Sequence, residues 1–178
     1  VNVLDDIPRR ALRIFRTIPQ PSIVKPADSG SSLGTSLARS FEDLLRGVYL
    51  AFEFSDTAIV EEYISGREAT CGVVDGFRGQ RLYPLFPIEI RPKSSAFFDY
   101  EAKYSGASEE ICPGHFSSDE RRLLERAAVV VHDALGLRHY SRSDFIVHPR
   151  RGIYFLEVNT LPGLTSESLF PKSLRAVG

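Results

Sequence analysis

The sequence predicts an α+β fold with antiparallel sheets, and two observations carry this prediction. Apolar side chains recur every three or four residues over residues 36–52 and 123–135, which is the spacing of an amphipathic helix with one buried face. Strands joined by short turns pair antiparallel. Two pairs of strand-like stretches separated by such turns are residues 68–74 with 80–86, and residues 145–147 with 153–158.

Local signals place the remaining elements. Ser117 is a capping hydroxyl followed by acids, so we expect the second helix to start there and to stop at Gly136. Pro26 ends a short strand over residues 22–25. The other expected elements are a helix over residues 5–16, a Gly/Ser loop over 28–34, strands over 58–64 and 88–91, a long loop over 92–114 with a short strand near Tyr100, a loop over 160–168, and the beginning of a helix over 169–177.

Composition excludes several classes of protein. The 178 residues are 43% hydrophobic and 25% charged, with a formal net charge of −1, which gives no electrostatic reason to expect nucleic acid or an anionic membrane as a partner. No apolar run approaches the ~20 residues of a membrane span. Cys71 and Cys112 do not form a disulfide framework, which fits a cytoplasmic protein. The sequence lacks methionine, so we expect a piece of a longer protein.

The second hairpin gathers polar side chains. Alternation along a strand puts Arg142 and Asp144 on one face, and likewise Glu157 and Asn159. Folding the chain about the turn near residues 150–151 places Asp144 roughly opposite Glu157. Like charges that face each other destabilise a sheet, whereas two carboxylates and an amide oxygen suit Mg²⁺. Arg142 would then stabilise charge on a transferring phosphoryl group. Spacing alone equally allows a surface pair of Arg142 with Asp144 and a solvated Glu157.

Two further segments have features of nucleotide binding. The glycines of residues 28–34 let backbone amides approach an anion, Ser31 adds a hydroxyl, and Lys25 precedes the loop. No Gly-Lys-Ser/Thr follows, so this is not a Walker A loop. The strand end at residues 61–64 can hold an adenine edge, and Glu68 ribose hydroxyls. Each signal alone is also that of an ordinary loop or edge strand.

Together these residues resemble the D-alanine–D-alanine ligase family, within the ATP-grasp superfamily. The resemblance runs from about Ser22 to the C-terminus. The segments that carry it are Ile23-Val24-Lys25-Pro26 with Gly30-Ser31-Ser32-Leu33-Gly34, Val60-Glu61-Glu62-Tyr63-Ile64-Ser65-Gly66-Arg67-Glu68, Phe98-Asp99-Tyr100-Glu101-Ala102-Lys103-Tyr104, Arg142-Ser143-Asp144, and Glu157-Val158-Asn159-Thr160-Leu161-Pro162-Gly163-Leu164-Thr165-Ser166.

The resemblance implies a fold, a reaction and roles by position. It implies an ATP-grasp fold with two α/β lobes, about residues 20–90 and 91–178, that hold ATP between them. It implies ligation of two D-alanines through an acyl phosphate, for peptidoglycan synthesis. For the nucleotide, the implied roles are phosphate binding by Lys25 and Lys103, adenine binding by Glu61, Glu62, Tyr63 and Ile64, and ribose binding by Glu68. For the metal, the resemblance implies that Asp144, Glu157 and Asn159 bind two Mg²⁺ (or Mn²⁺) ions. For the reaction, it implies stabilisation of the tetrahedral intermediate by Arg142 and Gly163, a hydroxyl network of Ser31, Tyr104 and Ser168, and a second D-alanine pocket at Ser168 and Leu169.

The sequence also departs from the family pattern. Glu62 stands where a lysine is frequent and Tyr63 where a tryptophan or apolar residue is frequent. The family's N-terminal domain is missing, so we expect the chain alone to be inactive, and a homodimer is possible only for the complete enzyme. Two other functions stay open. One is another ATP-grasp carboxylate–amine ligase with a different acceptor, or the related D-alanine–D-lactate ligase; the resemblance associates a tyrosine at Tyr104 with amine acceptors, which argues against the lactate type. The other is a nucleotide-binding module without catalysis.

Overall fold

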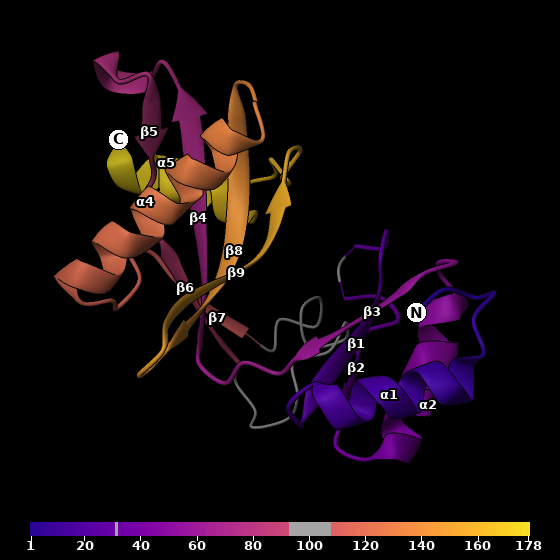
Figure 1. Ribbon diagram of the computed structural model, residues 1–178. Helices are drawn as coiled ribbons and strands as arrows, with labels where there is room; N and C mark the ends of the chain where they lie inside the picture. Colours follow the sequence, from indigo (N-terminus) through magenta and orange to yellow (C-terminus); the bar gives the residue numbers. More distant parts are fainter. Residues whose placement is uncertain (31, 93–107) are drawn as a thin grey trace. The chain divides into compact units, whose positions relative to one another are not determined.

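The computed structural model describes residues 1–30, 32–92 and 108–178, which form two compact units (Figure 1). Unit 1 contains Val1–Tyr63, and unit 2 contains Ile64–Arg91 and Ser108–Gly178. The two lobes expected at about residues 20–90 and 91–178 stay a prediction; the compact units of the structure change over after Tyr63. Ser31, Lys103 and Tyr104, with the strand expected near Tyr100, lie outside the described residues.

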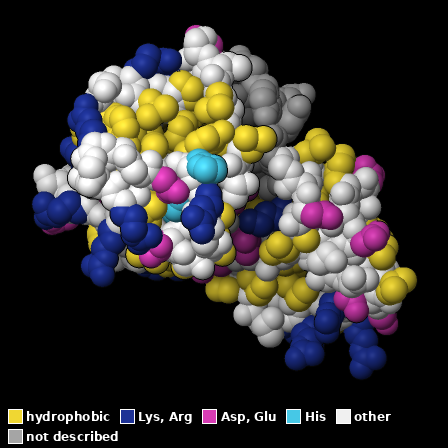
Figure 2. Space-filling model, turned by 90° about the horizontal axis from the view of Figure 1, so that it is seen from above, with side chains coloured by type: hydrophobic (Ala, Val, Ile, Leu, Met, Phe, Trp, Pro, Cys, Tyr) yellow, Lys and Arg dark blue, Asp and Glu magenta, His cyan; other side chains and the backbone are white. Residues whose placement is uncertain are grey.

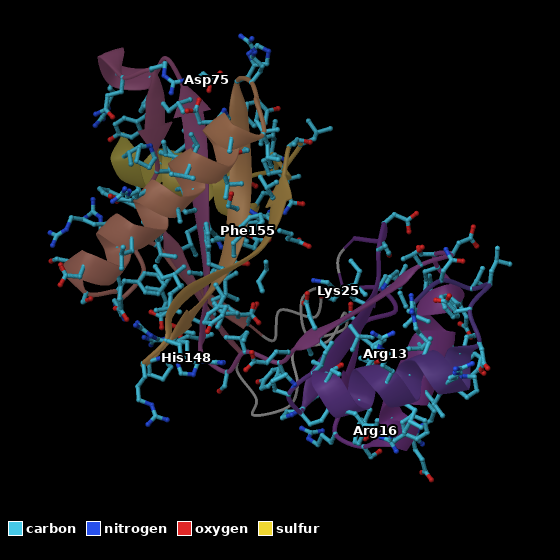
Figure 3. All side chains as sticks on the ribbon, viewed as in Figure 1. Arg13, Arg16, Lys25, Asp75, His148 and Phe155 are labelled. Atoms are coloured by element: carbon cyan, nitrogen blue, oxygen red, sulfur yellow. The ribbon has the colours of Figure 1, made fainter. Side chains whose placement is uncertain are left out.

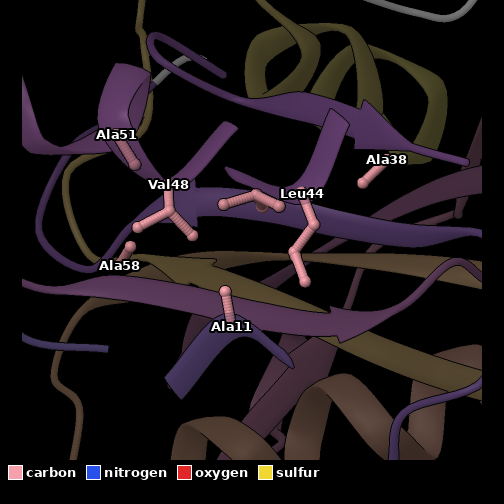
Figure 4. Close-up of a cluster of buried hydrophobic side chains, with 7 residues drawn as sticks. Ala11, Ala38, Leu44, Val48, Ala51 and Ala58 are labelled. Carbon is pink, nitrogen blue, oxygen red and sulfur yellow. The ribbon is translucent and has the colours of Figure 1, made fainter. Parts of the chain in front are cut away.

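Unit 1 packs two helices on a three-stranded antiparallel sheet whose strand order is β2-β1-β3. Its core holds Leu44 and Val48 of one helix against Ala11 of the other and Val24 of the sheet (Figure 4). These apolar side chains are fully buried, so the sheet and both helices share one core. The elements are α1 (Ile7–Thr17), β1 (Ser22–Pro26), β2 (Ser36–Ala38), α2 (Phe41–Phe52) and β3 (Ala58–Glu62).

The expected helix start at residue 36 is wrong. Ser36–Ala38 forms β2 and pairs with β1, whose edge offers backbone partners to this segment. The helix begins at Phe41 because Ser40 caps it: the Ser40 hydroxyl accepts a hydrogen bond from the Asp43 amide, and the Asp43 carboxylate accepts one from the Ser40 amide. The helix expected over residues 5–16 is confirmed as α1, with Asp6 as its N-cap.

Unit 2 contains a six-stranded sheet. Five of its strands follow the order β7-β6-β4-β8-β9, and the sixth, β5, pairs with β4. Helices α4 and α5 cover opposite faces of this sheet. Alternate β4 residues Ala69, Cys71 and Val73 pack on α4, whereas Gly72 lies against Phe170 of α5. The elements are β4 (Arg67–Asp75), η1 (Phe77–Gly79), β5 (Leu82–Pro84), β6 (Ile88–Pro92), β7 (Ser108–Ile111), α4 (Ser118–Ala134), β8 (Tyr140–His148), β9 (Gly152–Asn159) and α5 (Leu169–Val177).

Both expected hairpins are confirmed, as β4–β5 and β8–β9. Ser117 caps α4 with a complete capping box to Glu120, and Gly136, with a φ of +61°, follows the helix end. Sequence patterning missed β7, which lies inside the stretch expected to be a loop. The last helix, α5, spans Leu169–Val177.

Some large apolar side chains of unit 2 remain exposed. Leu123 and Val130 of α4 are 53% and 56% exposed. Figure 2 shows exposed apolar side chains gathered on one face of the molecule, with Lys and Arg side chains beside them. None of the helices in the described residues is long and apolar enough to cross a membrane.

Candidate functional site

The hairpin β8–β9 brings the predicted metal ligands together. Asp144 lies directly opposite Glu157, and Arg142 directly opposite Asn159. Arg142 pairs with Gly72 across β4–β8, so the group occupies the sheet face on which α5 packs. The pairing predicted from sequence is therefore confirmed, while the metal role of these residues stays a prediction.

A β-bulge produces this pairing. Next to the turn the hairpin is regular, and it pairs Phe145 with Phe155; Phe155 is labelled in Figure 3. Continued without change, that ladder would place Asp144 opposite Leu156 and turn Glu157 to the other face of the sheet. A register shift between Asp144 and Phe145 adds one residue on β9, and Glu157 consequently faces Asp144.

The Asp144 carboxylate is held by three side chains. Arg142 donates to both oxygens, from Nε at 3.0 Å and from Nη2 at 2.9 Å. Thr70 Oγ1 donates to Asp144 Oδ1 at 2.6 Å from the neighbouring strand β4. Asn159 Nδ2 donates to Asp144 Oδ2 at 3.4 Å and lies 3.5 Å from Glu157 Oε1. Thr70 was missed by sequence reasoning, because only the pairing of two strands distant in sequence reveals it.

The donor set fits a hard divalent cation. Two carboxylates and one amide share a sheet face, and the Glu157 side chain is exposed while that of Asp144 is 21% exposed. The Asn159 amide donates to both carboxylates, but the same amide turned over presents its oxygen there. The described residues contain no group of three or more His, Cys, Asp or Glu side chains arranged for a metal. The cation would therefore depend on the amide and on oxygens of a bound ligand.

Glu68 shares the Asp144 face of the sheet. It precedes Thr70 by two positions on β4 and pairs with Ile146 of β8, so its side chain emerges on the same side as that of Thr70. The predicted ribose acid and the predicted metal ligands thus belong to one surface of unit 2.

The predicted nucleotide residues of unit 1 form an ion pair. Lys25, on β1 (Figure 3), lies with Nζ 2.7 Å from Glu61 Oε1 on β3, and the two side chains are 27% and 38% exposed. The Tyr63 amide donates to the carbonyl of Pro21 at 3.1 Å, so this backbone donor of the expected adenine edge is already engaged. Lys25 and Glu61 are therefore brought together, with Glu62 next in the chain.

The loop after β9 places Gly163 against Ser168. A Cβ at Gly163 would come within 2.7 Å of Ser168 Oγ, so a larger residue there would require the Ser168 side chain to move. The Ser168 hydroxyl lies 2.8 Å from that of Thr165, and Ser168 is the N-cap position of α5, directly before Leu169. The predicted intermediate-stabilising glycine and the predicted substrate serine are therefore neighbours.

Comparison with known proteins reveals extensive similarity. The family model described as "D-ala D-ala ligase C-terminus" matches residues 8–178. A D-alanine–D-alanine ligase of Desulfotalea psychrophila is 47% identical over 161 residues, covering 89% of this chain and 49% of that protein. One of Leptospira biflexa is 40% identical over 175 residues, covering 96% and 49%.

Solved structures agree with the sequence comparison. The VanG D-Ala:D-Ser ligase of Enterococcus faecalis gives a TM-score of 0.84 at 33% identity, covering 98% of this chain and 51% of that one. A D-alanine–D-alanine ligase of Bacillus anthracis complexed with ATP gives 0.74 at 31%, covering 94% and 51%. The predicted α+β, ATP-grasp fold is thereby confirmed, and the chain spans about half the length of these relatives.

Proposed function

The chain belongs to the family of D-alanine–D-alanine ligase C-terminal domains, and from that premise we propose that it is the ATP-grasp part of such a ligase. The proposed reaction joins two D-alanines and converts one ATP to ADP and phosphate, for peptidoglycan precursor synthesis in the cytoplasm. One observation carries the proposal beyond family membership: Asp144 and Glu157 are like charges set directly opposite each other by a bulge. Arg142 pairs with Asp144 but leaves the two acids with a net negative charge, which a cation would offset.

The proposed chemistry assigns work to the residues of each unit. Asp144, Glu157 and Asn159 would hold two Mg²⁺ ions (or Mn²⁺), which neutralise charge on the phosphates. Arg142 would stabilise negative charge that develops at the reacting centre. The first D-alanine would be activated at its carboxylate as an acyl phosphate, and the amine of the second would attack that carbonyl carbon, with phosphate leaving.

Nucleotide contacts are proposed for both units. Lys25 would bind a phosphate of ATP, and that phosphate would replace Glu61 as the ionic partner of Lys25. Glu61 through Ile64 would hold the adenine, and Glu68 would hold the ribose. Lys103 is proposed as a second phosphate ligand. Ser31 and Tyr104 are proposed to complete the hydroxyl network with Ser168, and Leu169 to line the second D-alanine site.

The test is calorimetric titration of ATP with and without Mg²⁺. We expect Mg²⁺-dependent binding in the parent chain and its loss in Glu157→Gln, which removes one charged oxygen. The control is Glu109→Gln, which makes the same charge change at an exposed residue of β7, the strand at the opposite edge of the same sheet. Equal Mg²⁺ dependence in parent and Glu157→Gln would refute the metal assignment.

The 178 residues alone should bind Mg-ATP but form negligible dipeptide. The chain spans about half the length of its relatives. Positioning of both substrates can lower the activation barrier of a reaction by ~7–11 kcal/mol, and we propose that part of this positioning needs residues from the other half of the relatives' length. Phosphate release at saturating D-alanine measures this. Turnover within the usual enzyme range of ~1–10³ s⁻¹ would show that these 178 residues are sufficient for ligation, and this expectation would then be wrong. A homodimer is proposed only for the complete enzyme.

A second candidate concerns the acceptor. The structural neighbour named a D-Ala:D-Ser ligase suggests that the second substrate could be an amino acid other than D-alanine. Product analysis of the complete enzyme, with D-alanine, D-serine and D-lactate supplied together, separates the possibilities. For the dipeptide-forming enzyme, Tyr104→Phe should raise the share of hydroxy-acid product, and an unchanged ratio would remove Tyr104 from acceptor choice.

A further inference from the structure

We infer that Thr70 is the positioning residue for Asp144, fixing the carboxylate so that it can act as a metal ligand. This inference rests on the proposed function of the Asp144 site. Thr70 itself would touch neither metal nor nucleotide, and it acts through a single hydrogen bond.

The surroundings of Thr70 make it a rigid support. It lies on β4, which is flanked by β6 and β8, and it pairs with Ile88 on one side and with Asp144 on the other. The residue is 1% exposed. A β-branched side chain in the middle of a sheet has few rotamers available, so the position of the hydroxyl is determined by the sheet.

The hydrogen bond from Thr70 is short and selective. Thr70 Oγ1 lies 2.6 Å from Asp144 Oδ1, within the range typical of a hydroxyl donating to a carboxylate. Its distance to the other acceptor, the carbonyl of Ser143, is 3.3 Å. A hydroxyl has one proton to donate, and the shorter contact identifies Asp144 as the recipient.

Arg142 cannot replace this support. It also binds Asp144, through two hydrogen bonds, but the proposed reaction directs its guanidinium toward charge on the substrate. Arg142 gives Asp144 two of its five N–H donors, and a shift of the guanidinium toward substrate would weaken those two contacts. Thr70, buried and without access to substrate, keeps its contact throughout. Outer contacts of this kind orient metal ligands and tune metal affinity.

The experiment measures Mn²⁺ affinity of the full chain in the presence of ATP, by electron paramagnetic resonance. Thr70→Val keeps the shape and removes the hydroxyl, whereas Thr70→Ser keeps the hydroxyl and removes the methyl. We expect Thr70→Val to weaken Mn²⁺ binding by about tenfold or more and to change the spectrum of the bound ion. Thr70→Ser should stay near the parent value, and ATP affinity without metal should not change.

The matched control is Ser143→Ala. Ser143 is also fully buried on β8, and its hydroxyl has no hydrogen-bond partner among the described residues. Its removal should leave Mn²⁺ affinity unchanged, which would show that losing a buried hydroxyl from this sheet is not sufficient to weaken the site.

Three results would overturn the inference: parent-like Mn²⁺ affinity in Thr70→Val, an equal loss in Thr70→Ser, or an equal loss in Ser143→Ala. Should Thr70→Val not fold, Thr70→Ala against Thr70→Ser makes the same comparison. Failure of the proposed function is distinguishable, because then the parent itself would show no metal dependence, or would keep it in Glu157→Gln.

Discussion

The two units treat paired charges across neighbouring strands in opposite ways. In unit 1, Lys25 and Glu61 are unlike charges joined at 2.7 Å across β1 and β3. In unit 2, Asp144 and Glu157 are like charges directly opposite each other on β8 and β9. The first arrangement is favourable without any ligand, whereas the second is unfavourable in isolation.

Under the proposed function, this difference predicts how each unit would respond to its ligand. A partly exposed ion pair such as Lys25–Glu61 contributes little stability, so the proposed replacement of Glu61 by a phosphate would have a small energetic cost. The Asp144–Glu157 pair, in contrast, has Arg142 as the positive partner of Asp144, while the neutral side chains of Thr70 and Asn159 only donate hydrogen bonds to it. Under the proposed function, unit 1 would thus exchange one partner of Lys25 for another, while unit 2 would gain a cation between two acids.

Core truncations give the largest expected effect and test whether the bulge is held by packing. Phe145→Ala should lower the free energy of unfolding by ~3–5 kcal/mol, because this buried ring borders the bulge and packs edge-on against Phe155, with the ring centroids 5.9 Å apart. Leu44→Ala in unit 1 should cost ~2–5 kcal/mol. Urea denaturation measures both. If the Phe145 variant kept parental Mn²⁺ affinity once folded, packing at this ring would not hold the register.

The two acids should respond differently to loss of charge. Glu157→Gln should weaken Mg²⁺-dependent ATP binding at least about tenfold, since outer contacts alone are worth that much. The free energy of unfolding of the ligand-free protein should stay level or rise by ~0.2–1 kcal/mol as the repulsion is removed. Glu61→Gln should neither weaken the Mg²⁺ dependence of ATP binding nor raise the free energy of unfolding. A marked loss of stability in Glu157→Gln would contradict the like-charge interpretation.

The helix caps should be equivalent in the two units. Ser40 in unit 1 and Ser117 in unit 2 both form complete capping boxes. Replacement of either serine by alanine should lower the free energy of unfolding by ~0.5–2 kcal/mol. Thermal unfolding of both variants measures this. A difference well outside that range would mean that the cap of one helix also supports the surrounding sheet.

The smallest expected effect is the acid dependence of these capping boxes. The hydrogen bond from Arg46 lowers the pKa of Asp43 from 3.8 to about 2, and that from Arg67 lowers the pKa of Glu120 below its usual 4.5. A carboxylate with a depressed folded-state pKa stabilises the protein above its unfolded-state pKa, and this stability is lost as pH falls toward the folded value.

The stability difference between parent and Asp43→Asn should therefore shrink as pH falls from 3.8 to about 2. That between parent and Glu120→Gln should begin to shrink below 4.5. Urea denaturation across this acid range gives both curves. Differences that stayed constant with pH would show that neither charge contributes to folding.

Local signals in the sequence were sufficient for most elements. The capping hydroxyl of Ser117, the glycine after α4 and the alternation around the second turn predict a helix and a hairpin that the structure contains. The signals failed at β2 and β7. These are short strands whose formation depends on pairing with β1 and β6, and such pairing leaves no periodicity in three or four residues.

The sequence by itself determined which chemical groups the site contains. Asp144, Arg142, Glu157 and Asn159 lie on two strands joined by a short turn, and covalent connection alone keeps them near one another. The sequence also predicts that Asp144 lies roughly opposite Glu157, but only the tertiary structure reveals the bulge that brings this pairing about, because one bulged residue reverses the face on which a side chain emerges. The tertiary structure also supplied Thr70, 74 positions away along the chain, since contacts between distant strands are set by packing of the whole sheet rather than by any local pattern.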